Sequence, residues 1–158
     1  MSERRNLLTM FLEYLTAAVL AALAFLICLQ IFYRYVLEAP LTWSEEILRF
    51  LFVWLSFLGA TILFRRGGHF RLDFLVHKTA KPEMARKILI VVDLIVLVFI
   101  CLLTYQGTTL LKMAFFNRYV AVDMSMGWSY LAIPICSGLM IPYVVSDLLK
   151  DIRGRKKL

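Results

Sequence analysis

Four long apolar stretches constrain this chain more than any other feature of its sequence. They cover roughly residues 14–33, 43–64, 88–111 and 128–149, with short connectors between them. Twenty helical residues rise about 30 Å, which matches the hydrocarbon core of a bilayer. Hydrophobic residues make up 61% of the 158 residues and the mean hydropathy is +0.78, more than a soluble core of this size could bury. The sequence predicts an all-α integral membrane protein, a single domain of four transmembrane helices over residues 1–158.

The positions of the basic residues predict how these helices are oriented. The net charge is +7, but Lys and Arg gather between the apolar stretches instead of along one polar face. That distribution is typical of a protein that contacts membrane lipids and disfavours nucleic acid as a partner. Of 18 Lys and Arg residues, the first and third connectors hold only Arg34, Arg49, Lys112 and Arg118. Because basic connectors stay in the cytoplasm, we expect the N and C termini and the 65–87 connector to be cytoplasmic.

The 65–87 connector is the most basic segment of the chain. Gly67 and Gly68 end the helix before it. Farther along, apolar and small residues recur at helical spacing: Leu72, Leu75, Val76 and Thr79. This pattern fits a short interfacial amphipathic helix, and an irregular loop fits it equally well.

Small residues line one face of the first predicted helix and recur in the second. In the first helix they are Ala17, Ala18, Ala21, Ala22 and Ala24. In the second helix, Ser56 and Ala60 are four residues apart, beside Gly59. Small residues at this spacing let helix backbones approach closely inside a membrane. Both helices are therefore expected to pack against other helices.

The connector from Arg34 to Arg49 holds an unusual number of charges for its place between two apolar stretches. Thr42 and Glu45 fit a capping box at the start of the second helix. Glu45 and Glu46 precede Arg49 by four and three residues, spacings that favour ion pairs on one helix face. Arg34 could close a cluster with these three residues. Paired carboxylates can also serve acid–base chemistry. No nucleophile, metal motif or phosphate loop lies nearby, so we expect a role in structure or assembly and no enzymatic activity.

Titratable residues near the membrane leave two other functions open. Glu13 could couple protons in a self-sufficient four-helix exporter, although its place at the membrane boundary, like that of Asp93, favours simple hydration. A membrane anchor of a redox enzyme would need haem ligands in the spans, whereas His69 and His77 both lie in the 65–87 connector. Three cysteines lie inside the apolar stretches without the spacing of a disulfide or metal site: Cys28, Cys101 and Cys136. We expect no cofactor and no metal.

Several motifs give the chain a resemblance to a known family. It resembles the small membrane subunit, DctQ-like or SiaQ-like, of tripartite ATP-independent periplasmic (TRAP) transporters. The motifs are Arg34-Tyr35, Pro40-Leu41-Thr42-Trp43-Ser44-Glu45-Glu46, Arg49-Phe50, Gly59-Ala60, and Arg65-Arg66-Gly67-Gly68-His69 with Asp73. The resemblance covers residues 30–73 by motif and the whole chain by length and four-span layout.

The resemblance implies a partner system in a bacterial or archaeal inner membrane. In that family a large membrane subunit carries the sodium and substrate sites, and a periplasmic substrate-binding protein delivers an organic acid. The small subunit is expected to be a scaffold beside the large subunit that helps to dock the binding protein.

The resemblance also implies roles for two groups of residues. The outward end would be organised by Arg34, Trp43, Glu45, Glu46 and Arg49. The cytoplasmic side would be organised by Arg65, Arg66, His69 and Asp73. In the other outward connector, contact with the binding protein or simple solvation is expected for Arg118 and Asp123.

Overall fold

The structure is a computed structural model that describes residues 7–65 and 82–152, and its regular secondary structure over these residues is helical. The helices are α1 (Leu7–Tyr35), α2 (Thr42–Arg65), α4 (Pro82–Ala114), α5 (Gly127–Tyr130) and α6 (Ala132–Ile152). Four helical segments are long and apolar enough to cross a membrane: Met10–Tyr35, Thr42–Arg65, Lys87–Ala114 and Gly127–Leu149. The predicted all-α class with four spanning helices is confirmed.

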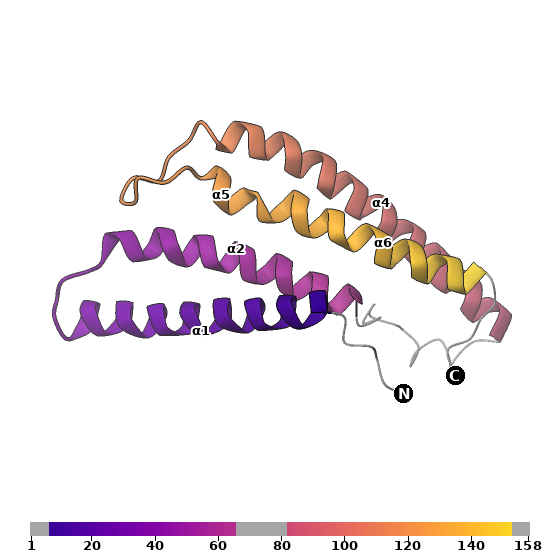
Figure 1. Cartoon of the computed structure of the whole chain (residues 1–158), viewed down its shortest axis with the longest axis horizontal. Coiled ribbons are helices and arrows are strands. Elements are labelled where there is room, and N and C mark those ends of the chain that lie inside the picture. The colour runs from indigo at the N-terminus through magenta and orange to yellow at the C-terminus, as the bar shows by residue number, and fades with distance from the viewer. Residues whose placement is uncertain (1–6, 66–81, 153–158) are drawn as a thin grey trace.

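The helices lie side by side in a row, in the order α1, α2, α6, α4 (Figure 1). Among the described helices α1 packs only against α2, α2 packs against α1 and α6, and α4 packs mainly against α6. The connections at residues 36–41 and 115–126 lie at the same end of the helix row, on the left in Figure 1. We call this end the turn end. The row has two edges, α1 and α4. It is not a closed bundle.

The core lies mainly between α2, α4 and α6. Its buried side chains are Leu12, Leu58, Ile100, Cys136, Met140 and Val144. Where α4 meets α6, a Cβ atom added to Gly107 would lie only 2.7 Å from Cγ2 of Ile133. Nearby, the Thr104 hydroxyl donates a hydrogen bond to Oγ of Ser137 at 2.9 Å. Because lipid tails are as apolar as these side chains, close packing and interhelical hydrogen bonds hold the row together.

One helix boundary differs clearly from that which the sequence predicted. The fourth span runs from Gly127 to Leu149, close to the predicted range of 128–149. Leu131, between α5 and α6, keeps helical backbone angles (φ −59°, ψ −29°), so the two helices continue one another. Helix α4 begins at Pro82, well before residue 88, since proline suits the first position of a helix. The possible interfacial helix falls largely on residues 66–81, outside the described residues.

The turn between α1 and α2 contains the described chain's one non-glycine residue with a positive φ. This residue is Glu38, with φ of 51°. Two residues before the end of α1, the carbonyl of Tyr33 accepts a hydrogen bond from the amide of Ala39 at 3.2 Å. A hydrogen bond over six residues is typical of a helix C-terminus that ends in a residue with left-handed backbone angles. That position, here Glu38, is usually occupied by glycine. At the start of α2, Oγ of Ser44 donates to the carbonyl of Leu41 at 2.7 Å, and no described hydrogen bond forms the predicted capping box.

Candidate functional site at the turn end

The carboxylate of Glu46 joins α2 to the loop at residues 115–126. Its Oε1 atom accepts a hydrogen bond from the amide of Val120 at 2.8 Å. Its Oε2 atom accepts hydrogen bonds from the amides of Ala121 at 2.9 Å and Val122 at 2.8 Å. Three successive amides that converge on one anion form a concave binding site of the kind called a nest.

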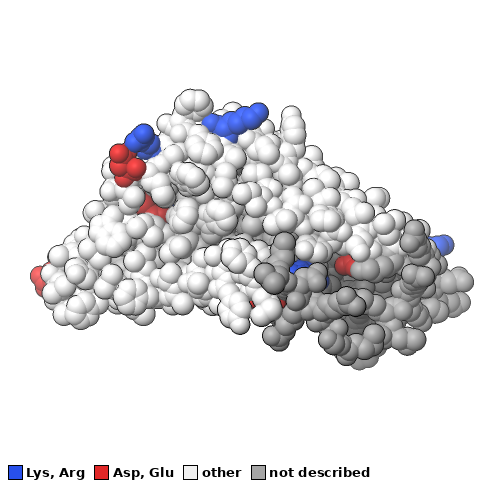
Figure 2. Space-filling model, viewed as in Figure 1, with Lys and Arg blue, Asp and Glu red and all other residues white. Residues whose placement is uncertain are grey.

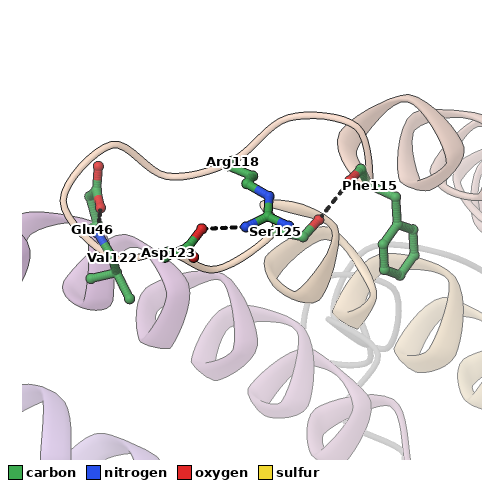
Figure 3. A network of polar contacts seen from close by, with 6 residues as sticks. All are labelled: Glu46, Phe115, Arg118, Val122, Asp123 and Ser125. Carbon is green, nitrogen blue, oxygen red and sulfur yellow. Dashed lines mark hydrogen bonds and ion pairs between the residues drawn. The ribbon is translucent and has the colours of Figure 1, made fainter.

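The 115–126 loop is itself held in a defined shape. Arg118 and Ser125 face each other in an isolated antiparallel bridge. The amide of Tyr119 donates to the carbonyl of Met124 at 3.0 Å. Oγ of Ser125 donates to the carbonyl of Phe115 at 3.0 Å, a contact drawn in Figure 3. The loop therefore presents its amides to Glu46 in a fixed arrangement and does not depend on Glu46 alone for its form.

Two further hydrogen bonds fix the loop and α5 to the rest of the turn end. The buried Tyr119 hydroxyl lies 2.6 Å from Oγ of Ser129, and either atom can be the donor. The indole N–H of Trp54, on α2, donates to the carbonyl of Trp128 at 3.1 Å. Together with Glu46, these contacts tie α2, the loop and α5 into one unit. Sequence reasoning missed them because neither partner of either bond carries a pattern that marks it.

The predicted outward cluster has its residues at the turn end, but its charged members do not pair with one another. Among the described residues, no ion pair within 4.0 Å joins Arg34, Glu45, Glu46 and Arg49. Arg34 lies 5.8 Å from the ring centroid of Tyr35, in a cation–π arrangement. Trp43, Glu45 and Arg49 are exposed. The assembly role of these residues stays a prediction.

Arg118 and Asp123 form an ion pair with each other across the 115–126 loop (Figure 3). Their side chains are 68% and 84% exposed, so both remain accessible. In the view of Figure 2 most of the described surface is uncharged, and acidic and basic side chains lie together near the turn end.

The predicted cytoplasmic group lies mostly outside the described residues. At the other end of α2, away from the turn end, Nη1 of Arg65 is buried without a described hydrogen-bond partner. Arg66, His69 and Asp73 lie outside the described residues.

The titratable residues considered for a proton-coupled exporter or a haem-binding anchor lie away from the turn-end hydrogen bonds or outside the described residues. Glu13 is half-buried on α1, and Asp93 is buried on α4, 5% exposed. His69 and His77 lie outside the described residues. Within residues 7–65 and 82–152 there is no group of three or more His, Cys, Asp or Glu that could hold a metal ion. The hydrogen bonds at the turn end join side chains to backbone groups and hydroxyls of the same chain, so their role is to stabilise the structure.

Comparison with known proteins gives a family match over most of the chain. Residues 23–154 match the family model described as tripartite ATP-independent periplasmic transporters, DctQ component. A putative TRAP transporter small permease protein of Haemophilus influenzae is 28% identical over 151 residues, which are 92% of each chain. The sialic acid TRAP transporter small permease protein SiaQ of Vibrio cholerae is 28% identical over 138 residues, 87% of this chain and 79% of SiaQ.

Two relatives are much longer than this chain. One is the isethionate TRAP transporter permease protein DctMQ of Oleidesulfovibrio alaskensis, 28% identical over 149 residues, which are 89% of this chain and 23% of DctMQ. The sialic acid TRAP transporter permease protein SiaT of Haemophilus influenzae is 32% identical over 130 residues. Those residues are 82% of this chain but only 21% of SiaT. A segment like this chain therefore also occurs as part of a much larger permease protein.

Proposed function

Because the chain belongs to the DctQ component family of tripartite ATP-independent periplasmic transporters, we propose that it is an accessory subunit that scaffolds a large membrane subunit. Membership places it among transporter components and not among enzymes. The length of SiaT supports a large permease subunit as the partner, since a matching segment there is covalently joined to the rest of a permease.

The main support for this proposal is that the carboxylate of Glu46 binds backbone amides of the 115–126 loop. A carboxylate that couples ion movement to transport must be able to release and take up its ion. Both oxygens of Glu46 instead accept hydrogen bonds from backbone amides, at 2.8 to 2.9 Å. Glu46 thus stabilises the shape of the turn end. A scaffold subunit needs such a fixed shape in order to hold its partners.

We propose that the turn end faces the periplasm of a bacterial or archaeal inner membrane and that the termini are cytoplasmic. The distribution of Lys and Arg supports this orientation. A periplasmic substrate-binding protein would then meet the 115–126 loop and the turn between α1 and α2. A loop already fixed by hydrogen bonds loses less conformational entropy on binding, which favours such a docking role. Arg118 and Asp123, both exposed, remain candidate contacts.

We further propose that the assembled transporter drives uptake of an organic acid with sodium. The names of relatives support an acidic substrate, since they specify sialic acid and, for a DctMQ permease of Oleidesulfovibrio alaskensis, isethionate. The sodium and substrate sites would lie in the large subunit.

The test of the accessory role is co-purification. The chain alone is tagged, expressed with the large subunit and extracted in a mild detergent. We expect that the large subunit is retained and that Glu46→Gln weakens its retention more than Glu45→Gln does, because Glu46, unlike Glu45, binds the loop amides. A tagged chain that elutes alone, and that moves protons across liposomes by itself, would favour the exporter and make Glu13 the residue to test.

The proposed charge cluster has its own test. If Glu45 and Arg49 act as a pair in the assembled transporter, Glu45→Arg and Arg49→Glu should each weaken assembly. The double variant should restore part of the loss, because it preserves the opposite charges at the same spacing. A double variant no better than either single one would remove the pair from the account.

A further inference from the structure

The two edges of the helix row have different surfaces. On α1, small residues spaced by four, three and four positions are all exposed: Ala17, Ala21, Ala24 and Cys28. On α4, six of the exposed residues are bulky and 53% to 63% exposed: Val91, Leu94, Ile95, Val98, Phe99 and Leu102. The α1 edge also exposes large side chains, among them Leu20 and Phe25, so it is shallow only along the line of the small residues. The α4 edge exposes large aliphatic and aromatic side chains.

These surfaces suit different neighbours in a membrane. Bulky aliphatic side chains gain little by leaving lipid, because lipid tails are equally apolar. Small residues let another helix approach until the two backbones nearly touch, which gains packing contacts that fluid lipid tails do not supply. The chain uses the same device internally, where Gly107 brings α4 against Ile133 of α6.

The neighbouring helix α2 also has small residues with open space beside them. Ser56 is exposed, and a Cβ atom added to Gly59 would meet nothing within 4 Å. No described helix covers α1 on the side away from α2. The small residues of α1 and α2 that the sequence marked for helix packing are thus largely unused within the chain.

We propose that the α1 edge, defined by Ala17, Ala21, Ala24 and Cys28, is the surface that receives a transmembrane helix of the large permease subunit, and that the α4 edge faces lipid. This inference rests on the proposed function. The two longer relatives point to a permease helix as the occupant, because a matching segment makes up only 21% and 23% of those permease proteins. Covalent joining keeps a permease beside every copy of that segment, which favours it over a second copy as the neighbour.

The three native cysteines provide a direct test without any substitution. Cys28 lies on the α1 edge, Cys101 is exposed on α4, and Cys136 is buried, 1% exposed. Each thiol is labelled with a lipid-soluble maleimide, in the chain alone and in the complex with the large subunit, and quantified by peptide mass spectrometry. The proposal predicts that the complex protects Cys28 and leaves Cys101 as reactive as before, with Cys136 unreactive in both samples. Protection of Cys101 without protection of Cys28 would overturn it.

A matched pair of substitutions tests the same edge by steric exclusion. Ala21→Trp adds bulk to the α1 edge, and Val98→Trp adds bulk to the α4 edge. Both positions are exposed, so the thermal stability of the chain alone should not change for either variant. Ala21→Trp should lower retention of the large subunit by about tenfold, the factor that corresponds to about 1.4 kcal/mol, whereas Val98→Trp should not.

The outcomes separate this inference from the proposed function. If the unaltered chain retains the large subunit and Ala21→Trp does so equally well, the edge assignment is wrong and the accessory role stands. If the unaltered chain retains no large subunit, the accessory role itself fails. If Cys28 is protected in the chain alone and oxidation links two chains through it, the α1 edge binds a second copy and the proposal is overturned.

Discussion

The close approach of α4 and α6 makes Gly107→Ala the sharpest perturbation of the fold. The new methyl carbon would lie 2.7 Å from Cγ2 of Ile133, where ordinary contacts begin at 3.4 Å. The helices must separate by about 0.7 Å, or Ile133 must leave its rotamer, and overpacking of this kind costs roughly 1–3 kcal/mol. The better helix propensity of alanine offsets up to about 1 kcal/mol. We therefore expect the free energy of unfolding to fall by up to about 2 kcal/mol, and by about 1–3 kcal/mol relative to a glycine-to-alanine change without the clash.

Unfolding in mixed micelles of a mild detergent and sodium dodecyl sulfate, followed by circular dichroism and tryptophan fluorescence, measures this loss. Gly59→Ala and Gly138→Ala are matched controls, because a Cβ atom at either position would meet nothing within 4 Å. They should be neutral or stabilising. Ile133→Ala removes the obstructing methyl group, so in a double-mutant cycle it should recover about 1 kcal/mol of the Gly107→Ala loss. A Gly107→Ala variant as stable as the controls, or a cycle without coupling, would show that the contact with Ile133 does not limit how closely α4 and α6 pack.

Three further predictions concern polar contacts and the α1–α2 turn. Glu46→Gln should speed hydrogen exchange at the three loop amides that the carboxylate binds, whereas Glu45→Gln should leave them unchanged; equal exchange in both variants would contradict the assigned hydrogen bonds. Ser137→Ala should lower the free energy of unfolding by about 0.6 kcal/mol, the average for interhelical hydrogen bonds in a membrane, and should lose its effect when Thr104 is already valine. Glu38→Gly should raise the free energy of unfolding by about 1 kcal/mol because φ is 51° there, and a Glu38→Ala variant with the same gain would show that backbone conformation is not the cause.

The spans and the helical class follow from the sequence because they depend on composition over about twenty residues. Each apolar stretch is long enough to cross a bilayer, and each lies within helical segments of the structure. The start of α4 at Pro82, before the predicted residue 88, depends on a single residue, and composition over a whole span does not locate it.

The pairing at the turn end could not be predicted in the same way. The spacing of Glu46 and Arg49 suggested a local ion pair, but the carboxylate binds amides 74 to 76 residues farther along the chain. Every residue except proline carries such an amide, so the sequence holds no mark of the three that converge. The shape of the 115–126 loop decides the partner, and that shape depends on contacts such as Tyr119 with Ser129.

Sodium-driven uptake into liposomes shows whether this chain is an accessory subunit. The large subunit alone, this chain alone and both together are reconstituted, each with the binding protein and substrate outside and a sodium gradient directed inward. The account predicts uptake only when both membrane proteins are present. Equal uptake by the large subunit alone would contradict the accessory role, and uptake by this chain alone would make it a transporter in its own right.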